Sequence, residues 1–69
     1  MAKLKDLLAF LKAQGWSEHR HEGGSHRVWV HLDGRQITIA IHPGREIDRP
    51  TLAKILKQAG YSLKEFWNR

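Results

Sequence analysis

The sequence predicts an α+β fold, a two-layer sandwich in which helices cover one face of a small antiparallel sheet. Two segments with the apolar spacing of helices flank three segments in which apolar and polar residues alternate. With 69 residues the chain is expected to form a single domain, residues 1–69, with a small core. The chain has no cysteine, which excludes disulfides, cysteine-bound zinc and thiol nucleophiles.

A first helix is predicted from four leucines that fall on one helical stripe: Leu4, Leu7, Leu8 and Leu11. Gly15 is a natural stop for this helix, because glycine readily adopts the left-handed conformation that often ends helices. Lys12 lies in the last turn, where its charge favours the negative end of the helix dipole.

Three strands are expected at residues 16–21, 27–32 and 36–41. The first is poorly hydrophobic, and Gly23 and Gly24 follow it as a break in the strand. The second and third strands alternate and are rich in β-branched residues. Asp33-Gly34 between them is a strong signal for a two-residue hairpin turn.

A two-residue loop at Asp33-Gly34 determines which residues of this hairpin share a face. The core face would then carry five apolar residues: Val28, Val30, Ile37, Ile39 and Ile41. The open face would carry basic, aromatic and polar residues: Arg27, Trp29, His31, Gln36, Thr38 and His42. His26 has the parity of the core face and would lie at its edge, beside Ile41.

A second helix is predicted near Pro50, which suits a helix N-terminus, and ends before Gly60. Its apolar stripe consists of Leu52, Ile55, Leu56 and Ala59. Ser62 and Glu65 form a capping box that opens a short C-terminal helix. The apolar side of that helix either completes the core or forms a surface for a partner, and it consists of Leu63, Phe66 and Trp67.

The charge of the chain indicates a polyanionic partner. Lysine and arginine outnumber aspartate and glutamate by 12 to 7, which gives a net charge of +5 and a pI near 10.1. Such a basic domain is typical of proteins that bind nucleic acid, although an acidic protein partner would use the same charge. No apolar run approaches the ~20 residues of a membrane span, and no signal-peptide pattern begins the chain. We therefore expect a cytoplasmic protein without a membrane partner.

Among the five histidines, His26 is the best placed for acid–base chemistry. It follows Gly23-Gly24-Ser25, whose backbone N–H groups can approach a phosphate closely. In RNA the 2′-OH attacks the adjacent phosphate once a base removes its proton, and histidine does this without a metal. Spacing alone, however, more often indicates a surface histidine after a loose glycine turn.

Other polar residues are candidates for contact with RNA. The candidates for contact with phosphate are Ser25, Arg20, Arg27, Arg35 and Arg45. His31 and His42 are further candidates, and Trp29 would either stack on a base or pack against the C-terminal segment or a partner. His19 and His21 share a strand face but lack further ligands, so we expect no metal site and no cofactor.

Several motifs together resemble the HicA toxin family. They are Gly24-Ser25-His26-Arg27, Asp33-Gly34-Arg35, Ile37-Thr38-Ile39, His42-Pro43-Gly44, and Thr51-Leu52 with the run from Ile55 to Gly60. The leucine-rich first helix that ends at Gly15-Trp16 fits the same pattern, so the resemblance covers nearly the whole chain. Each motif is weak alone, and their order and spacing make the combination fairly specific.

The resemblance implies a fold like that of double-stranded-RNA-binding domains, α-β-β-β-α, and the activity of an mRNA interferase. It also implies a HicB-type antitoxin that covers the active site. The catalytic histidine of the family falls on His26, and Arg27 occupies a position where many members have a second histidine. The alternative is a non-catalytic module, or a degenerate toxin, that binds RNA or an acidic protein with the same fold.

Overall fold

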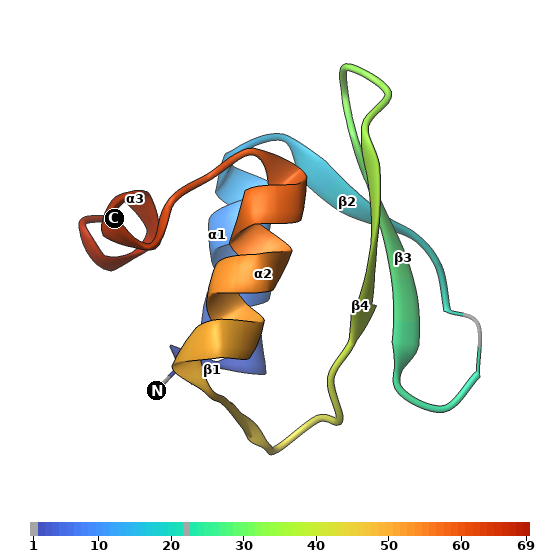
Figure 1. Ribbon diagram of the computed structural model, residues 1–69. Helices are drawn as coiled ribbons and strands as arrows, with labels where there is room; N and C mark the ends of the chain where they lie inside the picture. Colours follow the sequence, from blue (N-terminus) through green and yellow to red (C-terminus); the bar gives the residue numbers. More distant parts are fainter. Residues whose placement is uncertain (1, 22) are drawn as a thin grey trace.

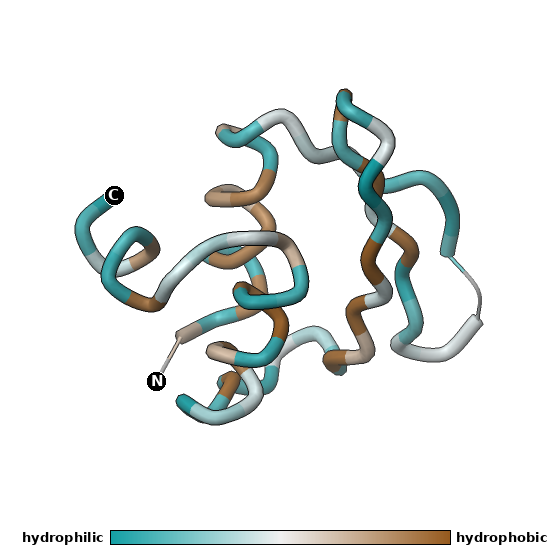
Figure 2. The backbone as a smooth tube through the Cα atoms, turned by 45° about the horizontal axis from the view of Figure 1, so that its top comes forward, coloured by the Kyte–Doolittle hydropathy of each residue, from teal (hydrophilic) through white to brown (hydrophobic). Residues whose placement is uncertain are grey.

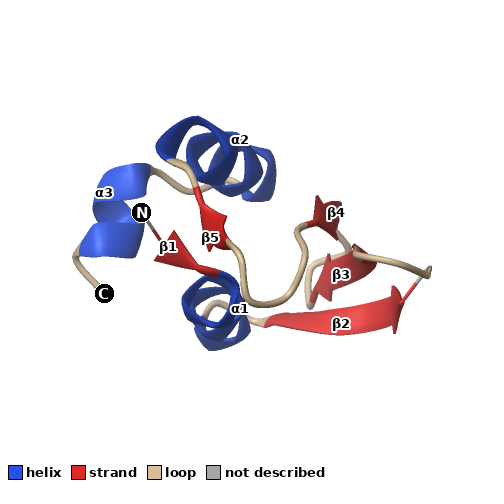
Figure 3. Cartoon of the chain, turned by 90° about the horizontal axis from the view of Figure 1, so that it is seen from below, coloured by secondary structure: helices blue, strands red, loops and turns tan. Residues whose placement is uncertain are grey.

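The computed structural model describes residues 2–21 and 23–69. Along the chain the elements are β1 (Ala2–Lys3), α1 (Leu4–Ala13), β2 (Trp16–His21), β3 (His26–His31), β4 (Gln36–Ala40), β5 (Glu46–Ile47), α2 (Arg49–Ala59) and α3 (Leu63–Trp67). β2, β3 and β4 form an antiparallel sheet in this order, and α1 and α2 lie on one side of it (Figures 1 and 3). The predicted α+β sandwich with a short C-terminal helix is confirmed.

The sequence pattern does not predict the second, two-stranded sheet. β1 and β5 are antiparallel, with Ala2 opposite Ile47 and Lys3 opposite Glu46. Figure 3 shows this pair between α1 and α2. Strands of two residues are too short to produce a recognisable alternation of apolar and polar residues. The pair joins the start of α1 to the segment that leads into α2.

Local hydrogen bonds define the ends of the helices. Asp48 caps α2 by accepting a hydrogen bond from the Thr51 N–H at 2.9 Å, and Gly60 ends this helix with a φ of +95°. Ser62 and Glu65 form the predicted capping box at the start of α3. None of the helices within residues 2–21 and 23–69 is both long and apolar enough to cross a membrane.

The core lies between the helices and the three-stranded sheet, and it contains more aromatic residues than the sequence pattern predicts. Phe10, Trp16 and Trp29 join the leucines and isoleucines of the predicted stripes. Phe66 is fully buried in an edge-to-face contact with Phe10, so α3 completes the core, whereas Trp67 is 48% exposed. In Figure 2, which colours the backbone by residue hydropathy, hydrophobic residues lie in the helices and in β3 and β4, while much of β2 is hydrophilic.

The register of the β3–β4 hairpin differs by one residue from the prediction. Trp29 pairs with Ile37, and Val28 pairs with Thr38. The loop has three residues: the N–H of His31 donates to the carbonyl of Arg35 at 2.8 Å, and Gly34 has a φ of +99°. This is the usual three-residue loop, a type I turn followed by a left-handed glycine.

The longer loop reverses the two faces of β3 relative to β4. Trp29 is 2% exposed on the core face, so the prediction that it lies on the open face and stacks on a base is wrong. Arg27 and His31 share its face. Val28 and Val30 lie on the other face, beside Thr38 and Gln36, although Val28 is still buried there, as predicted, at 1% exposed. An indole buries far more apolar area than a valine, so burial of Trp29 favours this register.

Candidate active site

His26 is the first residue of β3 and lies on the face of the sheet that points away from the helices. It pairs with Ala40 of β4 and not with Ile41, so the predicted place on the core face is wrong. The side chain is exposed, and its ring makes no hydrogen bond to any described residue. A ligand on the open face can therefore reach this imidazole directly.

The turn that leads into β3 positions His26 through its backbone. Gly23 and Gly24 have φ angles of +75° and +53°, which residues with side chains rarely adopt. The N–H of His26 donates to the carbonyl of Gly23 at 3.1 Å. Nε2 of His21 lies 2.8 Å from the carbonyl oxygen of Gly24. The two glycines and His21 together define where His26 leaves the turn.

A bulge in β2 places Arg20 on the same face as His26. The register shifts between Glu18 and Arg20, so that Arg20 pairs with Val28 and is a diagonal neighbour of His26. Diagonal neighbours on adjacent strands have Cβ atoms about 7–8 Å apart or closer, which a long side chain can span. Arg20 and His26 thus lie on one face, within reach of a common ligand.

Arg27 lies on the opposite face of β3 from His26, because neighbouring residues of a strand point to opposite sides. It pairs with Ile39, and its Nη1 atom is 3.5 Å from Oε1 of Glu18. Its Nε atom is buried without a hydrogen-bond partner among the described residues, as is Nε1 of Trp29. The predicted contact of Arg27 with a phosphate held by His26 does not fit this arrangement.

The bulge also separates His19 from His21. His21 pairs with Arg27 on the side of the helices, while His19 is the extra residue of the bulge, so their predicted shared face does not hold. In the part of the chain that the structure describes, no group of three or more histidines and carboxylates is placed to hold a metal ion.

His31 and Arg35 lie at the far end of β3 from His26, about 17 Å away along the strand. The His31 ring contacts Trp16 edge to face, with Nε2 2.6 Å from the carbonyl oxygen of Gln14. Nη1 of Arg35 donates to the carbonyl of Ala59 at 2.6 Å. The structure therefore ties both side chains to neighbouring elements and does not bring them to His26.

His42 and Arg45 lie in the loop between β4 and β5, at the same end of the sheet as His26. In Figure 1 this loop, the turn before β3 and the first turns of α1 and α2 all lie at the lower end of the molecule. This loop thus lies at the end of the molecule that carries His26.

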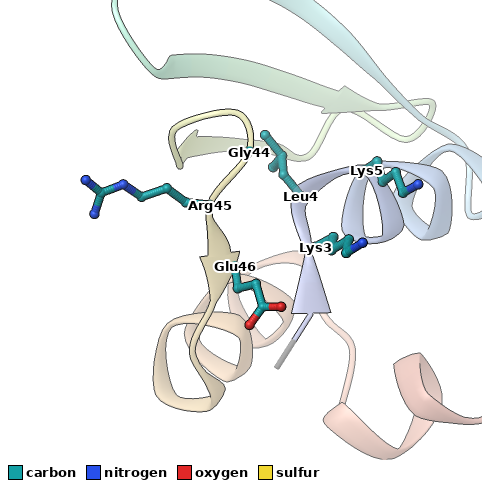
Figure 4. A pocket seen from close by; sticks show the side chains of 6 residues that line it. All are labelled: Lys3, Leu4, Lys5, Gly44, Arg45 and Glu46. Atoms are coloured by element: carbon teal, nitrogen blue, oxygen red, sulfur yellow. The ribbon is translucent and has the colours of Figure 1, made fainter.

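A cavity of about 320 Å³ opens at this end between β1, β5 and the start of α1. Its lining residues are Lys3, Leu4, Lys5, Gly44, Arg45 and Glu46. Figure 4 shows Arg45 extending to the side opposite Lys3 and Lys5. The lining contains no histidine, so this cavity is not the place of the acid–base group.

Two features of this site escape analysis of the sequence. The bond between His21 and Gly24 assigns a positioning role to a histidine that the sequence suggested only as a metal ligand. The face of Arg20 depends on a bulge, and a single extra residue leaves no mark in the alternation of a strand that is polar almost throughout. For the contact between His21 and Gly24, the only signal in the sequence is that the two residues are three positions apart.

Comparisons with known proteins found a family model and a similar protein. The family model described as "HicA toxin of bacterial toxin-antitoxin" matches residues 4–61. A similar protein is the "Probable mRNA interferase HicA 2" of Photorhabdus laumondii subsp. laumondii, which is 38% identical over 58 residues. That alignment covers 84% of this chain and 95% of the relative. The family match includes the whole three-stranded sheet and His26, and it ends before α3.

Proposed function

The chain belongs to the HicA toxin family, and on this basis we propose that it is the toxin of a toxin–antitoxin pair, an endoribonuclease that cleaves mRNA in the cytoplasm. The observation that carries the proposal is the exposed ring of His26, which follows a glycine turn on the open face of the sheet. A HicB-type antitoxin is its partner and holds it inactive.

In the proposed reaction, His26 removes the proton of the ribose 2′-OH, and the 2′ oxygen attacks the adjacent phosphorus. The bond from phosphorus to the 5′ oxygen of the next nucleotide breaks. The products are a 2′,3′-cyclic phosphate and a 5′-hydroxyl, and the protonated imidazole returns its proton to the departing oxygen. No metal or other cofactor takes part.

Arg20 is proposed to stabilise the negative charge that develops on the phosphate, because it shares the face of His26. Ser25, His42 and Arg45 lie at the same end and are proposed to contact the RNA chain on either side of the cleaved bond. Arg27, His31 and Arg35 are instead assigned to the support of the fold.

The proposal is tested by His26→Ala beside wild type, with His19→Ala as the matched control. General acid–base catalysis contributes roughly 100-fold or more, so His26→Ala should reduce RNA cleavage by at least about that factor. The control should cleave at the wild-type rate, and induced expression of wild type, but not of His26→Ala, should arrest growth. Fragments should carry cyclic phosphate ends and should form equally in excess chelator.

Cleavage by His26→Ala at the wild-type rate would remove His26 from the mechanism. Loss of cleavage in chelator would show that the reaction needs a metal. If wild type retards RNA in a salt-sensitive way and produces no fragments, the protein is a non-catalytic binding module.

A further inference from the structure

β4 is an edge strand of the three-stranded sheet, and its outer side has the features of a docking site for another strand. The hydrogen bond from the N–H of His31 to the carbonyl of Arg35 sets the alternation of the β3–β4 ladder. It follows that Ile37 and Ile39 bond to β3 through their backbone groups. The N–H and C=O groups of the residues between and beside them point outward, and these residues are Gln36, Thr38 and Ala40.

This edge lacks the usual protection against pairing with other chains. Natural edge strands are commonly interrupted by charged residues, proline or a bulge. β4 reads Gln-Ile-Thr-Ile-Ala, and it pairs with β3 without a shift in register. An uncharged, regular edge of β-forming residues pairs readily with another strand, so this edge is suited to the addition of a strand.

A groove runs along this edge between β4 and α2. It consists of two hollows of about 470 and 210 Å³ that share Thr38 and Gln58 in their lining. The other lining residues are Gln36, Ile37, Ala40, Ile41, Thr51, Lys54 and Ile55. A groove between an edge strand and a helix accepts an extended peptide, whose backbone pairs with the strand while alternate side chains enter the groove.

The occupant that fits is a strand of protein. RNA has no regular series of N–H and C=O groups to pair with the outward groups of Thr38 and Ala40. The groove lining carries Lys54 and, among the described residues, no carboxylate, while the whole chain has a net charge of +5. We propose that an extended segment of a partner protein with acidic side chains adds to β4 as a fourth strand.

This mode of docking brings the partner to His26. An added strand lies about 10 Å from β3, two strand spacings away. His26 pairs with Ala40 across the open face, so a domain attached to the added strand reaches over the imidazole. That the docked partner inhibits RNA cleavage rests on the proposed function, whereas the docking itself does not.

The experiment follows the backbone amides of the full chain by NMR during titration with a capped seven-residue peptide of alternating valine and glutamate. A peptide with lysine in place of glutamate is the matched probe. The amides of Thr38 and Ala40 should shift and exchange with solvent at least tenfold more slowly, and those of Ile37 and Ile39 should change less. The lysine peptide should bind at least tenfold more weakly.

Two variants test the proposal separately, so that a folding defect in one of them leaves the other as a valid test. Thr38→Pro removes an outward N–H and no bond to β3, so it should weaken the acidic peptide at least tenfold. Lys54→Glu keeps the edge and should reverse the preference between the two peptides.

The proposal is overturned if neither peptide protects Thr38 and Ala40. If the amides of Thr38 and Ala40 become protected at higher protein concentration without any peptide, the edge binds a second copy of this chain. Shifts of the same amides by a short RNA, and not by the peptides, assign it to nucleic acid. The NMR measurement does not depend on RNA cleavage. A protein that binds the peptide and does not cleave RNA would therefore contradict the proposed nuclease activity and leave the docking proposal standing.

Discussion

His26 and Arg27 are neighbours in the chain but lie on opposite faces of β3, and in the proposed reaction this decides which arginine can assist His26. A bulge one strand away brings Arg20 to the open face. Arg27 faces the helices and reaches Glu18. The chemistry of the site therefore depends on the parity of a strand as much as on the residue types present.

The conformation of Gly24 is the residue-scale feature that we expect to be the most sensitive. Its φ of +53° costs an alanine about 1–2 kcal/mol, although no atom lies within 4 Å of the added Cβ. Gly24→Ala should therefore lower Tm modestly and reduce RNA cleavage at least tenfold, because the turn no longer places His26 correctly. Cleavage rate and Tm are measured on the same samples.

Gly34→Ala is the matched control, since Gly34 has a φ of +99°, equally open surroundings, and a place at the other end of the sheet. It should lower Tm and leave cleavage unchanged. Equal loss of cleavage in both variants would show that the defect is one of general stability.

At the scale of secondary structure, most of the fold is predictable from the sequence. The leucine stripe of α1, the cap residues of α2 and the box at Ser62 and Glu65 are each local signals that packing does not override. The relation between strands is not local. Asp33-Gly34 occurs in hairpin loops of two residues and of three residues. The burial of Trp29 distinguishes the two loop lengths. The pattern of β-branched residues does not reveal that burial.

The candidate site is predictable in its place along the chain, whereas the face of the sheet on which it lies and the residues around it are not. The glycine turn places His26 at the start of β3, as the sequence suggests. Its neighbours depend on the loop length of one hairpin and on a bulge in β2, both of which are decided by packing across the sheet. For that reason Arg27 and Trp29 were natural candidates, and neither lies on the face of His26.

The N-cap of α2 makes stability depend on pH. Hydrogen bonds from the Thr51 side chain and N–H lower the pKa of Asp48 below its usual value of 3.8. The ionised form is thus favoured in the folded state. This contribution is complete above the unfolded pKa of about 3.9 and is lost as pH falls through the folded pKa. In thermal denaturation, the contribution of Asp48 to Tm should therefore be constant above about pH 5 and should decline in stronger acid.

Asp48→Asn keeps a good cap and removes the titration, so its Tm should decline less in acid than that of wild type. Asp48→Ala should lower Tm at every pH above that range. Asp33, whose pKa is lowered by the N–H of Arg35, titrates in the same range and remains in both variants. Parallel acid profiles for wild type and Asp48→Asn would contradict the assignment.

At the scale of the whole molecule, Arg35 connects elements that are far apart in the chain. Its Nη1 atom bonds the last carbonyl of α2, at Ala59, and its Nε atom bonds Asp33 in the hairpin loop. The guanidinium also lies over the rings of Trp16 and Tyr61 at 5.3 and 5.9 Å. One side chain thus links β2, the β3–β4 hairpin and the end of α2.

Arg35→Lys keeps the charge and loses the planar group that makes these contacts together. We expect the free energy of unfolding to fall by about 1–2 kcal/mol, measured by urea denaturation. Arg49→Lys, an exposed change in the first turn of α2, should have little effect. If the two variants were equally stable, Arg35 would not be the connection that its geometry indicates.

The pairing of β1 with β5 has a consequence for biosynthesis. Ala2 and Ile47 emerge from the ribosome far apart in time, yet they are partners in the finished protein. The start of α1 therefore stays without its β-strand partner until most of the chain has been made. A growing chain that stops before β5 lacks α2 and α3 as well, and with them six of the fifteen buried residues of the core cluster. If the chain is the proposed nuclease, this order of events delays the active fold until both β5 and α2 have been made.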